Sequence, residues 1–494
     1  MAAAPSLSPI TVPAVFKKQH GLAFWMERVL EECDRVTAKF AADPVHDLRV
    51  ALRRCRSMAD GLMTFDPDPS WKQMRKAGKK LFSSLGELRD VQVMQEWVGK
   101  LGSAEDPSSL ALVRYLENRE TEHKLQAAAA LRDFDRKQWG KWSTSMPRRA
   151  ARVRPGSLVF RHLALERWTQ AYELHRRALR LNSQVAWHGL RIGVKRFRYI
   201  VENFLPEQHE AWIADLKEVQ DLLGEVHDLD VLWDTALSIN AFPDSEARVR
   251  WHTRIAEERK RRIQRYRDKM LGKQSLWRLW RADLPTGKQI QTAATRRLEL
   301  WAAVLDPDFK HSRHVARLAL QLYDALAPNG SANGERNNER EILKLAALLH
   351  EVGLSKGVKR HHKASYRLIE KLHPPLGLDK DKLRMAAVVS RYHRGALPRA
   401  GQKTLAHISA AERTTARKLA GILRLANAFD ADHKTQIQRI QAETQNGYLQ
   451  IRAQGYNPRA RMAENIAAGR HLLEMVCHRP IVVQPMRAGS NHRK

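Results

Sequence analysis

Cysteine is scarce in this sequence: only Cys33, Cys55 and Cys477 occur among its 494 residues. No two of them have the close spacing of a structural zinc site, and a disulfide framework needs more thiols, so we expect neither feature. No apolar run approaches the roughly 20 residues that cross a membrane. A basic segment ahead of an apolar stretch is also missing at the N-terminus, so we expect no secretory signal. These absences predict a cytoplasmic globular protein without a membrane partner.

Acidic residues are outnumbered along the whole chain. The sequence holds 54 Asp and Glu against 86 Lys and Arg, a net charge of +32. Residues 1–290 hold 51 basic and 37 acidic residues, a net of +14, and residues 291–494 hold 35 and 17, a net of +18. An excess spread over both halves predicts a polyanionic partner, such as nucleic acid, an anionic membrane or a phosphate polymer. The length is sufficient for two or three domains.

Two short segments repeat one pattern of cations. Residues 46–56 read HDLRVALRRCR and residues 188–198 read HGLRIGVKRFR. Wound as helices, both put apolar side chains on one face and a stripe of basic residues on the other. The stripes consist of His46, Arg49, Arg53 and Arg56 in the first segment, and of His188, Arg191, Lys195 and Arg198 in the second. Because neither stripe contains an acidic residue, we expect an anion to lie between them.

A second motif follows each stripe in the same order. Residues 85–90 and 223–228 share the pattern LGxxxD, with Gly86 and Asp90 matching Gly224 and Asp228. A stripe helix followed by an LGxxxD helix therefore occurs twice, which indicates an internal duplication. Strand patterns are nearly absent before residue 436. We therefore predict an all-α first half built from two helical bundles side by side, residues 15–147 and 159–282.

The paired stripes and LGxxxD segments resemble the conserved histidine α-helical domain (CHAD) family over roughly residues 15–282. This resemblance implies duplicated four-helix bundles with a basic groove that binds inorganic polyphosphate. Carried onto the matching positions, it nominates all eight stripe residues as polyphosphate ligands. Three lysines of the following helix, Lys76, Lys79 and Lys80, are weaker nominees because the second copy does not repeat them.

The second half carries histidines in five pieces: residues 311–326, 345–353, 360–369, 391–398 and 423–433. A histidine, then a histidine followed by a carboxylate, then a distant polar residue on a helix is typical of HD-type metal phosphohydrolases. These blocks resemble more closely the C-terminal HD-like domain of the exopolyphosphatase / guanosine pentaphosphate phosphohydrolase family, over roughly residues 295–485. We expect a mostly helical domain with a small C-terminal β-hairpin.

Two of the four ligand positions that the HD resemblance assigns are changed. They are occupied by His311, His350, Glu351 and Asn427, where the HD pattern has aspartate at the last two. Glutamate displaces the ligand oxygens and asparagine removes a charge, so we predict no resident metal and no hydrolysis. If the site is active, His350 and Glu351 are the catalytic candidates, with Mg²⁺ or Mn²⁺. A secondary anion site is expected at His361, His362, Lys363, Arg391, His393 and Arg394.

The expected organisation is a flexible N-terminus (1–14), the duplicated domain (15–282), a linker (283–294), the degenerate HD-like domain (295–485) and a basic tail (486–494). The leading hypothesis is a non-catalytic protein that binds inorganic polyphosphate and associates with polyphosphate granules. One alternative is a metal-dependent phosphohydrolase acting on polyphosphate or on guanosine penta- or tetraphosphate. The other is a nucleic-acid binder, which the lack of aromatic residues in the stripes disfavours.

Overall fold

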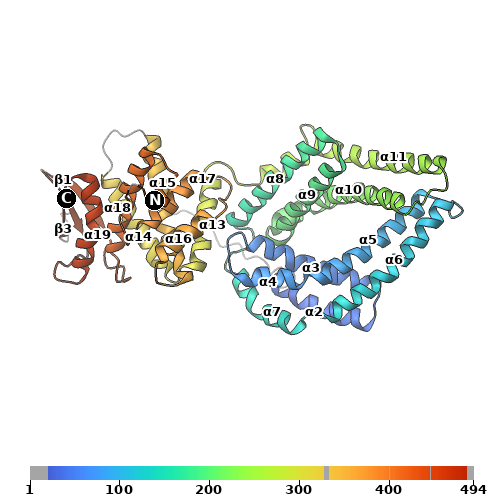
Figure 1. The fold of residues 1–494 in the computed structure, drawn as a ribbon, viewed down its shortest axis with the longest axis horizontal. Helices are drawn as coiled ribbons and strands as arrows, with labels where there is room; N and C mark the ends of the chain where they lie inside the picture. Colours follow the sequence, from blue (N-terminus) through green and yellow to red (C-terminus); the bar gives the residue numbers. More distant parts are fainter. Residues whose placement is uncertain (1–20, 327–332, 400, 446, 487–494) are drawn as a thin grey trace, which may run out of the picture. The chain divides into compact units, whose positions relative to one another are not determined.

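The computed structural model describes residues 21–326, 333–399, 401–445 and 447–486 (Figure 1). The chain divides into two compact units: unit 1 comprises Met1–Thr64 and Asp68–Gln289, and unit 2 comprises Phe65–Pro67 and Ile290–Lys494. No helix among the described residues is long and apolar enough to cross a membrane. The expected flexible N-terminus and all of the basic tail except Met486 lie outside the described residues.

Unit 1 is helical throughout its described residues. Its helices are α2 (Leu22–Ala38), α3 (Ala42–Leu62), α4 (Pro69–Ala77), α5 (Lys79–Leu101), α6 (Pro107–Arg132), α7 (Arg136–Ala150), α8 (Leu158–Leu181), α9 (Gln184–Phe204), α10 (Pro206–Ser238), α11 (Ser245–Met270) and α12 (Leu276–Ala282). Several begin where an aspartate side chain accepts a hydrogen bond from the first-turn backbone, as Asp68, Asp106 and Asp244 do. The all-α prediction for this half is confirmed.

The duplication is visible in how the helices of unit 1 pair. The stripe helix α3 packs against the other stripe helix, α9, and the LGxxxD helix α5 contacts the other LGxxxD helix, α10. Away from the stripes, the hairpins α5–α6 and α10–α11 share an apolar cluster that includes Trp97, Leu116, Leu229 and Trp251. Each of these helices therefore contacts its counterpart from the other copy, which is the pattern of a two-fold related pair of repeats.

Unit 2 is a helical domain with one small sheet. Its helices are α13 (Lys288–Leu305), α14 (Phe309–Leu326), α15 (Asn333–Leu349), η1 (Val352–Lys356), α16 (His361–Glu370), α17 (Lys380–Arg391), η2 (Lys403–Leu405), α18 (Ala410–Ala428) and α19 (Met462–Cys477). Helix α13 begins inside the stretch that we expected to be a linker, so only residues 283–287 separate it from α12.

The sheet of unit 2 has one strand more than the hairpin that we predicted. Strands β1 (Ile440–Gln445) and β2 (Tyr448–Ala453) form the expected antiparallel pair. Strand β3 (Ile481–Pro485) then pairs with β2 in parallel, after α19 has returned the chain to the same end of the sheet. A five-residue strand has too little periodicity to be recognised before its partner is known.

The core of unit 2 is aliphatic, yet a group of buried polar residues interrupts it. His311, His350, Glu351, His361 and His393 are each no more than 7% exposed. Buried imidazoles and carboxylates are costly unless they are paired or bind a ligand. This group, called the histidine cluster below, is therefore the first place in unit 2 to look for chemistry.

Candidate functional site

The two basic stripes of unit 1 lie on helices that pack directly on each other, α3 and α9. Facing them are the aspartates of the two LGxxxD helices, Asp90 on α5 and Asp228 on α10. The pKa of Asp90 is influenced by the charges of Arg49, Arg191 and Lys195, which come from both stripes. The structure thus brings residues of both copies into one site, called the stripe groove below.

Burial changes the ionisation of the groove's charged groups. Loss of solvation raises the pKa of Asp228 to about 6 and also raises that of Asp90, against the opposing effect of the nearby cations. The same cause, with help from Arg191, lowers the pKa of Lys195 to about 8. Asp90 nevertheless stays accessible to water. A side chain that is both accessible and crowded by protein atoms lies in a concave surface.

Two cations of the second stripe face Asp90 and Asp228 without forming a close ion pair among the described residues. Among the described residues, no ion pair of 4.0 Å or less joins Arg191 or Lys195 to a carboxylate, and the buried Nε of Arg191 has no hydrogen-bond partner. Both side chains are half-buried. Positive charge that is partly desolvated and unpaired is well suited to contact an anion directly.

The other stripe arginines are partly committed to the protein. Arg49 donates to the carbonyl oxygens of Leu85 and Gly86 at 3.1 and 3.2 Å. Arg56 donates to the carbonyl oxygen of Arg75 at 2.8 Å. Both guanidinium groups lie over the Phe82 ring. They shape the groove and keep the remaining N–H donors for a ligand.

Glu202 is an acidic partner of both stripes that lies outside them in the sequence. It lies one helical turn beyond Arg198 and is almost fully buried, at 4.0 Å from that residue. It also reaches across the helix pair to Arg53, at 3.4 Å, and to Arg54, at 2.5 Å. Sequence reasoning missed both Glu202 and Arg54, because their pairing joins residues nearly 150 positions apart. The spacing Arg198-xxx-Glu202 was the one available signal.

The histidines and lysines nominated from the sequence have different surroundings. His46 is exposed, whereas His188 lies on His227, with their Nδ1 atoms 3.3 Å apart. Burial and the charge of Arg191 lower the pKa of His227 to about 4, so this ring is neutral at pH 7. Lys76, Lys79 and Lys80 are all exposed, and Lys80 pairs with Asp133 at 2.5 Å.

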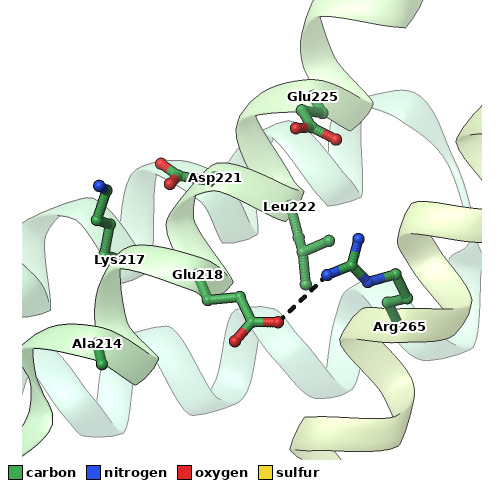
Figure 2. Close-up of a pocket in the computed structure, with 7 residues that line it drawn as sticks. All are labelled: Ala214, Lys217, Glu218, Asp221, Leu222, Glu225 and Arg265. Atoms are coloured by element: carbon green, nitrogen blue, oxygen red, sulfur yellow. Dashed lines mark hydrogen bonds and ion pairs between the residues drawn. The ribbon is translucent and has the colours of Figure 1, made fainter.

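A hollow of unit 1 lies elsewhere, between α10 and α11 (Figure 2). It encloses about 430 Å³ and is lined by Ala214, Lys217, Glu218, Asp221, Leu222, Glu225 and Arg265. Figure 2 shows Arg265 turned toward Glu218, which it meets at 3.4 Å. Three carboxylates against two cations do not suit a polyanion, so this hollow is not a candidate for the same ligand.

In unit 2 the histidine cluster joins five residues from four segments. His311 lies on α14, His350 and Glu351 form the turn after α15, His361 begins α16, and His393 follows α17. Backbone carbonyl oxygens hold three of the rings: the Nδ1 atoms of His350, His361 and His393 lie 2.7, 3.0 and 2.7 Å from those of Ala347, Val358 and Ser390. Each Nδ1 therefore carries a proton, and burial lowers the pKa of His350 and His393, so their Nε2 atoms are acceptors. Burial has the same effect on His361, but its pairing with Glu351 outweighs it and raises the pKa of this ring.

The four positions that the HD resemblance assigns do come together. The Asn427 side chain on α18 lies 3.0 Å from His311 Nε2 and 3.3 Å from His350 Nε2. Asp430 holds His311 from the other side, with a carboxylate oxygen 2.8 Å from Nδ1. The atom that faces both rings is Asn427 Oδ1, which accepts a hydrogen bond from a ring that carries a proton on Nε2. Although burial opposes it, hydrogen bonding to Asp430 and to Asn427 raises the pKa of His311, so this ring is the donor. The structure places this amide between the rings.

The expected secondary anion site is divided by the structure. His361 and His393 are buried in the histidine cluster, while Lys363 and Arg394 are exposed. Burial, with the charge of Arg391, lowers the pKa of His362 to about 4. Two of the six residues therefore face Glu351 rather than solvent, because their rings complete the core of the cluster.

Two family models match the chain, and both agree with the resemblances described above. Residues 23–237 match the CHAD domain, and residues 292–463 match domain III of the Ppx/GppA phosphatases. The first match contains both stripes and both LGxxxD segments. The second contains the whole histidine cluster. No curated protein matches the chain.

Proposed function

Because the chain joins a CHAD domain to a Ppx/GppA phosphatase domain III, we propose that it is a non-catalytic protein that binds inorganic polyphosphate in the stripe groove of unit 1. The observation that carries this proposal is the pair Arg191 and Lys195, half-buried and without an ion-pair partner among the described residues. Cytoplasmic location and association with polyphosphate granules stay predictions.

A linear phosphate chain suits the charge pattern of the groove. Its repeating unit carries one negative charge, and the stripes repeat a cation at each helical turn. Arg191 and Lys195 lie one turn apart on α9, and Arg49 contributes from α3. Arg191 and Lys195 are half-buried and have already lost part of their solvation, so a bound ligand displaces less water from them.

Nucleic acid suits the same surface less well. Single strands are normally held by bases stacked on aromatic faces. Near the stripes those faces are already covered, since Arg49 and Arg56 lie over Phe82, Arg53 over Tyr199 and Arg54 over Trp25. Polyphosphate has no bases to stack, so its binding does not need these aromatic faces.

The double change Arg191→Gln with Lys195→Gln tests the proposal. We expect the affinity for long-chain polyphosphate, measured by calorimetry at moderate salt, to fall by about tenfold or more, since two charged contacts are lost. The control is Arg176→Gln with Arg177→Gln, which removes the same charge from exposed positions on α8. Equal losses in both variants would show that net charge alone attracts the polymer, and would reject the groove.

The histidine cluster supports a second candidate, a phosphohydrolase acting on polyphosphate or guanosine pentaphosphate. Its catalytic residues would be His350 and Glu351, and a bound divalent metal would polarise a phosphoryl oxygen and activate water. Incubation of the protein with each substrate and Mg²⁺ or Mn²⁺ separates the candidates. Phosphate release that His350→Gln abolishes would establish hydrolysis, whereas binding without release supports the binding protein.

A further inference from the structure

We propose that unit 2 holds one divalent first-row metal ion between Glu351, His361 and His393. These three residues offer their ligand atoms within 4.8 Å of one another, and all are buried. The set shares only Glu351 with the quartet that the sequence suggested, because it uses His361 and His393 in place of His311, His350 and Asn427. The site is distinct from the stripe groove, so the proposal does not depend on polyphosphate binding.

The separations of the ligand atoms match those around a single ion. Nitrogens bonded to one tetrahedral zinc ion at about 2.0–2.1 Å lie about 3.3–3.4 Å apart. The Nε2 atoms of His361 and His393 are 3.3 Å apart. The Glu351 oxygens lie 3.0 Å from His361 Nε2 and 3.5 Å from His393 Nε2. The 3.0 Å distance is to Oε2 and the 3.5 Å distance is to Oε1, so each carboxylate oxygen faces one ring nitrogen, at separations close to those around one ion.

The hydrogen bonds of the ring nitrogens also support a bound ion. Each Nδ1 of His361 and His393 is engaged by a backbone carbonyl oxygen, so both rings turn Nε2 toward each other and toward the Glu351 carboxylate. Glu351 Oε2, although close to His361, is buried without an aligned hydrogen bond. Acceptors that converge in a buried place need a cation. Nδ1 donation to a carbonyl is also the usual support of a metal-ligating histidine.

A neighbouring position is closed by the protein itself. His311 and His350, with Glu351, form the other possible ligand group. There Asn427 Oδ1 lies 3.0 Å from His311 Nε2 and 3.3 Å from His350 Nε2, so the amide group occupies the place of a second ion. The cluster is therefore expected to bind one ion and not two. Two imidazoles and one carboxylate favour zinc, iron, cobalt or manganese over magnesium.

Titration of the chelator-treated full-length protein with Zn²⁺, Co²⁺ and Mn²⁺ tests the site. We expect one ion per chain by elemental analysis after dialysis, and a rise in the thermal unfolding midpoint when the ion is added. Bound Co²⁺ should show the visible absorption of nitrogen and oxygen ligation. If no ion binds and the midpoint does not change, the cluster holds only a proton and the proposal is wrong.

Substitutions locate the ion. His361→Gln and His393→Gln should each weaken binding by about tenfold or more, whereas His407→Gln, at an exposed histidine of the same unit, should leave it unchanged. Asn427→Asp should raise the stoichiometry from one ion to two, because a carboxylate replaces the amide between His311 and His350. Unchanged binding in folded His361→Gln would overturn the assignment. If that variant does not fold, two other measurements test the assignment: the number of ions bound by Asn427→Asp and the Co²⁺ spectrum of the unaltered protein. One ion in Asn427→Asp, or a spectrum without nitrogen and oxygen ligation, would overturn it.

Discussion

At the scale of single residues, the charge of the stripe groove depends on two groups that titrate on either side of neutrality. Asp228, with a pKa of about 6, loses its negative charge as the pH falls. Lys195, with a pKa of about 8, loses its positive charge as the pH rises. Both changes act in the same direction, because the groove becomes more positive at each step toward acid. An anionic ligand should therefore bind more tightly as the pH is lowered.

We predict that polyphosphate affinity falls in two steps as the pH rises, near the pKa values of Asp228 and Lys195. Each step should be about fivefold, corresponding to about 1 kcal/mol for one charge in a water-accessible site. Calorimetry at constant ionic strength measures the profile. Asp228→Asn should remove the lower step and Lys195→Arg the upper one. An affinity that does not vary with pH would mean that neither group faces the ligand.

Individual site residues could be predicted where the pattern was local. The stripes follow from helical spacing, and the structure places Arg49, Arg191 and Lys195 together near Asp90. Glu202 could not be assigned, because its role depends on α3 lying against α9. The histidine cluster shows the same limit: the motifs nominated His361 and His393 for a secondary anion site, and only the packing of α16 and α17 shows that both rings face Glu351.

At the scale of elements, the contact between α3 and α9 rests on a buried ion pair. Arg54 and Glu202 have side chains that are 12% and 4% exposed and lie 2.5 Å apart. We expect Glu202→Gln to lower the free energy of unfolding by about 3–5 kcal/mol, because Arg54 keeps its charge without a partner. Urea denaturation measures the change.

The matched control for this pair is Asp60→Asn, which breaks the exposed Asp60–Arg75 pair in the same unit. It should cost less than about 1 kcal/mol, as exposed pairs usually do. If both variants lose the same amount, the helix contact does not depend on the buried charges.

A glycine fixes the turn that carries Glu351. A Cβ atom at Gly353 would lie 2.1 Å from the carbonyl oxygen of His361 and 2.5 Å from the backbone nitrogen of Ser365. We predict that Gly353→Ala destabilises the protein by about 1–3 kcal/mol, as overpacking does, and displaces His361. Thermal unfolding measures the loss. Gly334→Ala, in open space on α15, should instead be neutral or slightly stabilising. Equal midpoints for the two variants would contradict the close packing at Gly353.

Helices were easier to predict than their junctions. The stripe and LGxxxD helices follow from hydrophobic periodicity and from the repetition itself. The start of α13 at Lys288 and the strand β3 could not be predicted from periodicity, since a short segment takes its structure from the neighbour it packs on. The parallel pairing of β3 with β2 depends on α19, whose return path no local pattern specifies.

At the scale of the whole molecule, the net charge of +32 attracts any polyanion, so specificity must come from the groove. We predict that the logarithm of polyphosphate affinity falls linearly with the logarithm of salt concentration. At moderate salt, polyphosphate should bind more tightly than single-stranded DNA at equal phosphate concentration. Competition with a labelled polymer measures both. Equal affinities, or a preference among DNA sequences, would favour a nucleic-acid binder.

The pairing of α3 with α9 and of α5 with α10 has a consequence for the direction in which a polymer lies. A surface made of two related halves offers nearly the same contacts after a half-turn. Inorganic polyphosphate is identical when read from either end, whereas a nucleic acid has distinct 5′ and 3′ directions. A polyphosphate chain therefore makes the same contacts in either orientation along the groove, and the two halves of the groove offer it nearly the same contacts. The two ends of the bound chain differ in their surroundings only where the copies differ, as exposed His46 differs from paired His188.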